Sequence, residues 1–79
     1  MNTNELTPQQ RLVLTFIRDY VAENGFPPSH RDIQKYFGYA SSRSAARYVN
    51  RLEDHGYLKT KPGTARGIRL IKQKEYENE

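Results

Sequence analysis

The 79-residue sequence contains no cysteine, which excludes a disulfide framework and any thiolate metal site. Its two histidines, His30 and His55, cannot hold a metal ion by themselves, and we expect both at the surface. No apolar run approaches the roughly 20 residues of a membrane-spanning helix, and the N-terminus lacks the apolar segment of a signal peptide. We therefore expect a cytoplasmic protein with no membrane contact, no metal and no cofactor.

Catalytic patterns are also missing. Three of the four serines lie between residues 41 and 44, with no candidate general base beside them. The sequence has neither a Walker-type phosphate loop nor a pair of carboxylates suited to a catalytic cleft. We predict that the chain is not an enzyme and has no catalytic residues.

Positive charge is present, but it is unevenly distributed. Residues 1–39 are neutral, residues 40–74 carry a net charge of +7, and residues 75–79 carry −3, which gives the total of +4. A neutral half joined to a basic half is typical of a protein that binds a polyanion. The alternative, from charge alone, is a basic surface that faces only water.

The first predicted helix begins at Thr7. Thr7 can cap it, Pro8 suits the first helical position and Gln10 completes a capping box. Gly25 ends this helix of about 17 residues. Its apolar stripe has the i, i+3, i+4 spacing of a buried face and consists of Leu12, Val13, Phe16, Ile17, Tyr20 and Val21.

A second, two-turn helix begins after Ser29, which forms a capping box with Asp32, and stops at Gly38. We expect it to present Ile33, Tyr36 and Phe37 to the core.

Residues 40–47, with the sequence ASSRSAAR, open a third helix that Gly56 terminates. At 100° per residue its buried stripe consists of Ala45, Tyr48, Val49 and Leu52. The opposite side carries Arg43, Arg47, Asn50, Arg51 and Asp54.

Residues 57–61 and 67–71 read as two strands joined by a turn at 62–65, with pairing that ends near Leu70. The predicted fold class is α+β, mainly α: a three-helix winged helix-turn-helix with a C-terminal two-stranded β wing. We assign residues 1–6 to a flexible N-terminus, 7–71 to the winged helix domain and 72–79 to a charged tail.

The composition of residues 40–47 suits the end of a helix that enters the major groove of double-stranded DNA. Serines donate to phosphates or base edges, arginines reach guanine, and alanines permit close approach. Ala45 is also small enough to let two helices cross tightly. The alternative is an ordinary surface helix capped by Ser41 or Ser42.

Three segments, LTPQQRLVLTFIRDYVAENGFPPSHRDI, GYASSRSAARYVNRLEDHGYL and RGIRL, together resemble the N-terminal DNA-binding domain of LexA repressors. The resemblance runs from about Leu6 to Leu70 and implies a transcriptional repressor of the SOS response to DNA damage. It also implies that Ser41, Ser42, Arg43, Ser44, Ala46 and Arg47 face bases and phosphates. The chain departs from the family at Tyr48 and Val49, where members often carry His-Leu.

LexA repressors continue into a self-cleaving serine peptidase domain through which they mainly dimerise, and this sequence has no counterpart of that domain. We therefore expect a monomer in isolation and a possible dimer on an operator with two half-sites. The alternative function is a winged-helix module for protein–protein contacts. The full set of predicted DNA-binding residues is Ser29, Arg31, Ser41, Ser42, Arg43, Ser44, Ala46, Arg47, Asn50, Arg51, Lys61, Thr64 and Arg66.

Overall fold

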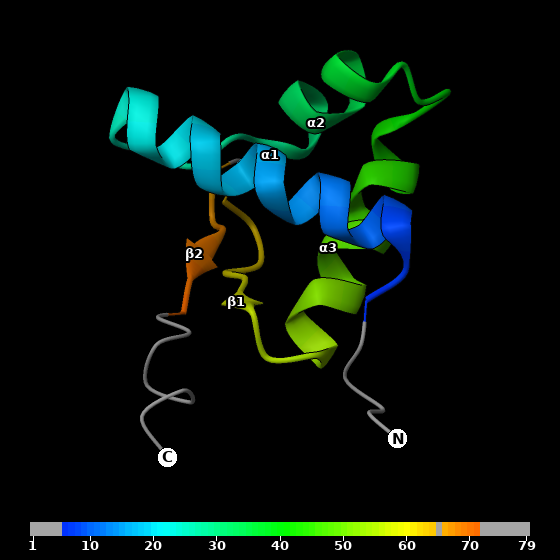
Figure 1. Ribbon diagram of the computed structural model, residues 1–79. Helices are drawn as coiled ribbons and strands as arrows, with labels where there is room; N and C mark the ends of the chain where they lie inside the picture. Colours follow the sequence, from blue (N-terminus) through cyan, green and yellow to red (C-terminus); the bar gives the residue numbers. More distant parts are fainter. Residues whose placement is uncertain (1–5, 65, 72–79) are drawn as a thin grey trace.

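The computed structural model describes residues 6–64 and 66–71 (Figure 1). Three helices, α1 (Pro8–Asn24), α2 (His30–Phe37) and α3 (Ser42–Asp54), precede a hairpin of β1 (Leu58–Lys59) and β2 (Arg69–Leu70). In Figure 1, α1 crosses the molecule above α3, and the hairpin lies beside α3. The predicted three-helix winged helix-turn-helix is confirmed. None of the described helices is long and apolar enough to span a membrane.

Both predicted capping boxes are present. Thr7 Oγ1 accepts from the amide of Gln10 at 3.1 Å, and Gln10 Oε1 accepts from the amide of Thr7 at 3.0 Å. Ser29 and Asp32 make the same reciprocal bonds at 3.1 and 3.0 Å. Each capping residue stabilises its helix by about 1 kcal/mol. These local bonds explain why the starts of α1 and α2 could be predicted to the residue.

The core lies where the three helices meet the hairpin. Its buried apolar residues are Leu6, Val13, Leu14, Ile17, Ile33, Ala45, Val49, Leu52, Leu58 and Ile68. Ala45 has no exposed surface and lies in the helix that packs most closely against α2, as expected for a small residue at a tight crossing. Tyr48 is half-buried and packs against this core.

Three residues were assigned wrongly to the core or to the flexible N-terminus. Leu12 is 55% exposed and Leu14 is buried instead, because Val13, Leu14 and Ile17 share one 100° arc of α1 and Leu12 lies a further 100° outside it. Tyr36 is 67% exposed, with its ring stacked on the outer side of the molecule against Phe16 at 4.3 Å between centroids.

The third wrong assignment concerns Leu6, which we placed in the flexible N-terminus. It is only 7% exposed and joins the core, so the folded domain begins one residue earlier than predicted. The remaining residues of the predicted N-terminal segment, and the predicted charged tail at 72–79, lie outside the described residues.

The wing strands are shorter than predicted, but their register is regular. Leu58 pairs with Leu70 and Lys59 with Arg69 in antiparallel order. Two further bonds continue this register: the amide of Lys61 donates to Gly67 O, and the amide of Ile71 to Tyr57 O, both at 3.0 Å. The prediction that pairing ends near Leu70 is confirmed, since β2 ends at Leu70 and the bond from Ile71 is the last one between described residues. A Cβ at Gly67 would lie 2.6 Å from Lys61 O, so this crossing of the two wing segments requires glycine.

Candidate nucleic-acid interface

The start of α3 is open to solvent. Ser41 occupies the N-cap position, but its hydroxyl makes no capping bond to the helix. Ser41, Ser42 and Arg43 are exposed, and Ser44 is half-buried. The Ser41 hydroxyl therefore does not cap the helix, and it is available to another acceptor or donor.

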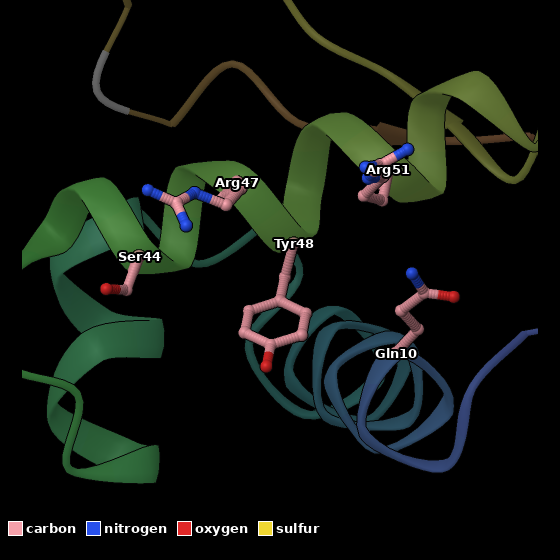
Figure 2. Close-up of a pocket in the computed structure, with 5 residues that line it drawn as sticks. All are labelled: Gln10, Ser44, Arg47, Tyr48 and Arg51. Atoms are coloured by element: carbon pink, nitrogen blue, oxygen red, sulfur yellow. The ribbon is translucent and has the colours of Figure 1, made fainter.

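The predicted contact residues of α3 lie along two flanks of the helix. On the flank toward α1, a hollow of about 200 Å3 is lined by Gln10, Ser44, Arg47, Tyr48 and Arg51. Figure 2 shows Tyr48 projecting from α3 toward α1 and Gln10 projecting from α1 toward α3, with Arg47 and Arg51 on the same helix. The lining holds two guanidinium groups and no carboxylate, so its chemistry suits an anion.

The position of the Tyr48 ring is fixed by a stack of aromatic side chains. Its ring stacks on Tyr39 at 5.4 Å between centroids, and Tyr39 in turn stacks on Phe37 at 5.5 Å. Gln9 Nε2 donates to the Tyr39 hydroxyl at 2.7 Å. Burial raises the pKa of Tyr39 above its ordinary value of 10, so this hydroxyl stays neutral at physiological pH. The contacts set the beginning of α1 against the turn between α2 and α3.

On the other flank of α3, a groove of about 480 Å3 separates the helix from the wing. Ala46 and Asn50 line it from α3, Lys61 and Thr64 from the wing, and His30 from α2. A smaller neighbouring hollow of about 360 Å3 gathers the beginnings of α2 and α3 and the wing tip. Its lining residues are Ser29, His30, Arg31, Ser42 and Thr64.

The structure therefore brings most of the predicted residues to three hollows around α3. Ser29, Arg31, Ser42, Ser44, Ala46, Arg47, Asn50, Arg51, Lys61 and Thr64 all line one of these three hollows. Ser41 and Arg43 lie at the exposed start of α3, outside the hollows.

Arg66 differs from the other predicted DNA-binding residues, because its guanidinium is bound by the protein itself. Its Nη1 lies 2.9 Å from Asp32 Oδ2, donates to Pro27 O at 2.8 Å and lies 3.4 Å from the Tyr20 hydroxyl. The guanidinium also covers the Phe26 ring at 4.9 Å from its centroid. Arg66 thus joins the wing to the segment before α2.

Asp32 serves both this contact and the start of α2. The backbone hydrogen bond from Ser29 has the largest effect on the pKa of the Asp32 carboxyl and lowers it; burial is the next effect and raises it, and the hydrogen bond and charge of Arg66 lower it further, so the net shift is downward. The carboxylate is therefore charged at neutral pH, and it lines none of the three hollows described above.

Another carboxylate is held by the wing. Glu53 accepts from the amide of Thr60 at 3.2 Å and from its hydroxyl at 2.9 Å. These bonds attach the end of α3 to the hairpin and direct this negative charge toward the protein. Glu53 therefore does not neutralise the positive charges of the exposed first half of α3.

Sequence reasoning missed several residues of this region: His30, Gln10 and Tyr48 on the helices, and further lining residues in the wing. His30 stands between two predicted contacts, Ser29 and Arg31, and its position at the beginning of α2 was the available signal. Gln10 had been assigned only its capping role, and Tyr48 only a place in the core. Both roles are real, but the same side chains also line the hollow between α1 and α3.

A short helix, a tight turn, an exposed basic helix start and a hairpin beside it define a winged helix-turn-helix DNA-binding domain. Comparison with known families agrees: the family model of the LexA DNA binding domain matches residues 3–67. The chain belongs to this LexA DNA-binding domain family, as its resemblance predicted.

Curated relatives support the same family. The chain is 42% identical to the LexA repressor of Moorella thermoacetica over 67 residues, which cover 85% of this chain and 33% of the relative. It is 46% identical to LexA repressor 2 of Pseudomonas putida over 65 residues, covering 82% and 32%. With the LexA repressor of Petrotoga mobilis it shares 45% over 67 residues, covering 85% and 32%. The chain spans about a third of the length of these relatives.

Proposed function

We propose that the chain binds double-stranded DNA in a sequence-specific manner and represses transcription. Its family is described as a DNA binding domain, and its relatives are named repressors. The observation that carries the proposal is the exposed, basic and serine-rich start of α3, with the wing tip and the beginning of α2 beside it. Its regulation of DNA-damage genes follows by the same family analogy.

The first half of α3 enters the major groove in this proposal, and Arg43 and Arg47, one turn apart on its exposed side, read bases. The neighbouring residues at the start of α3 also face bases and phosphates: Ser41, Ser42, Ser44 and Ala46. The residues at the edges contact phosphates: Ser29 and Arg31 at the beginning of α2, Asn50 and Arg51 from α3, and Lys61 and Thr64 from the wing. Arg66 acts indirectly in this proposal, by holding the wing against Asp32.

The proposal also covers the catalytic inactivity, the domain bounds and the oligomeric state of the chain. The binding unit acts without catalysis and without a cofactor, and residues 7–71, extended by Leu6, form its domain. It is a monomer in isolation and pairs on an operator with two half-sites, which sedimentation with and without such a duplex would test.

The alternative, a winged-helix module for protein contacts, requires large apolar anchors on the basic face. The exposed large hydrophobic residues among those described are Leu12, Phe26 and Tyr36, in α1, the following connection and α2. They lie outside the three hollows described above, so the chemistry of the surface around α3 supports DNA as the partner in preference to a protein.

The experiment that tests the proposal is titration of duplex DNA at several salt concentrations. With about four to six phosphate contacts, log affinity should fall with log salt at a slope of roughly −4 to −5. Selection from randomised duplexes should enrich one short sequence. Affinity that does not change with salt, or a selection that enriches no sequence, would count against the proposed function.

A further inference from the structure

His30 lies where three parts of the recognition face converge. It is the first residue of α2, it is half-buried, and it lines both the groove between α3 and the wing and the hollow at the wing tip. Thr64 is the other residue that lines both. An anion bound on this side of α3 would therefore lie beside the imidazole.

The charged groups around His30 are mainly positive. Arg31 lines the wing-tip hollow from α2 and Lys61 lines the groove from the wing, whereas α3 contributes the uncharged Ser42, Ala46 and Asn50. Asp32 is two residues along α2, but its carboxylate is engaged by Arg66 and the Ser29 amide. No carboxylate lines either hollow among the described residues, so an anion that stabilises an imidazolium here must come from a ligand.

We propose that His30 binds a DNA phosphate in its protonated form, so that DNA binding takes up one proton from solvent. This inference rests on the proposed DNA-binding function. Histidine is the side chain that ordinarily changes charge between about pH 5 and pH 8, and the imidazolium has two N–H donors. A phosphate beside it favours the charged form. By linkage, affinity for DNA must then rise as pH falls.

The chain supplies a matched control. His55, the other histidine, directly follows the last residue of α3 and lines neither hollow. The α-amino group also titrates near neutral pH, but it is common to all variants. Duplexes without terminal phosphates remove the remaining group that changes charge in this range.

The experiment measures the affinity of the whole chain for one such duplex between about pH 6 and pH 8 at constant ionic strength. The wild type should bind about three- to tenfold more tightly at the lower pH. His30→Gln should abolish this dependence, and His55→Gln should retain it. A wild type insensitive to pH, a His30→Gln variant that keeps the dependence, or a His55→Gln variant that loses it would overturn the inference.

A second measurement does not depend on the variants folding. The NMR resonances of the wild-type His30 imidazole should report protonation at higher pH in the complex than in the free protein, whereas those of His55 should not move. Equal behaviour of His30 with and without DNA would overturn the inference. Salt-dependent DNA binding without this effect would leave the proposed function standing, and absence of duplex binding at every pH would remove both.

Discussion

The guanidinium of Arg66 forms an ion pair with the carboxylate of Asp32, at 2.9 Å between Nη1 and Oδ2. The pair joins the wing to the first turn of α2, and the bond from Arg66 to Pro27 O at 2.8 Å strengthens this connection. The two side chains remain 42% and 29% exposed, so we attribute little folding stability to the pair. Its consequence is the placement of the wing beside α2 and α3.

Arg66→Ala should therefore weaken DNA binding by freeing the wing, with little change in the salt slope. Asp32→Asn, which keeps an oxygen for the Ser29 amide, should weaken binding in the same way. The double variant should lose no more affinity than either single variant, because both act through one contact. Additive losses, with a slope shallower by about one unit in Arg66→Ala, would instead show that Arg66 contacts a phosphate directly.

The hollow between α1 and α3 predicts a phosphate contact at Arg51. Arg51→Ala should reduce affinity for preferred and scrambled duplexes alike and make the salt slope shallower by about one unit. Arg18→Ala is the control, since Arg18 is an exposed cation of α1 that lines none of the three hollows. Titration against both duplexes at several salt concentrations measures the effect, and an equal change in slope for Arg18→Ala would refute this assignment.

Acid should weaken the fold through Asp32. Because its pKa is lowered in the folded state from the ordinary value of 3.8, the carboxyl contributes stability above that value and loses it as pH falls through the folded pKa. Chemical denaturation from neutral pH down to about pH 3 should show the free energy of unfolding falling less steeply for Asp32→Asn than for the wild type. Identical pH profiles of the two proteins would contradict the role of Asp32.

Two adjacent alanines should respond differently to enlargement. Ala45 has no exposed surface, so Ala45→Leu should overpack the core and reduce the free energy of unfolding by about 1–3 kcal/mol. Ala46 lines the open groove beside the wing, so Ala46→Leu should keep stability and weaken DNA binding. Thermal denaturation and DNA titration of both variants separate the two roles. An Ala45→Leu variant as stable as the wild type would contradict this prediction, because the core could then accommodate a larger side chain where α2 and α3 cross.

Features set by neighbouring residues could be predicted from the sequence. The capping boxes at Thr7 and Ser29 and the helix ends at Gly25 and Gly38 depend on contacts within about five residues. The buried stripe of α3 followed directly from helical periodicity. In α1 the predicted stripe included Leu12, whereas packing of the helices buries Leu14 in its place.

Contacts between distant segments could not be predicted. Arg66 and Asp32 are separated by 34 residues, and neither local sequence contains a pattern that predicts their ion pair. The convergence of His30 with the wing tip also depends on how α2 and the hairpin pack. The proposed DNA-binding region could nevertheless be predicted from the sequence, because its main residues are consecutive at the start of α3, and their contact with DNA stays a prediction.

The measurement that tests the central claim most directly is the affinity of Arg47→Ala for the preferred duplex and for a scrambled one. If α3 reads sequence through this side chain, the substitution should cost about 1–3 kcal/mol on the preferred duplex and little on the scrambled duplex, with relaxed specificity at one base pair. An equal loss on both duplexes would contradict the account, because Arg47 would then hold the DNA backbone without reading a base.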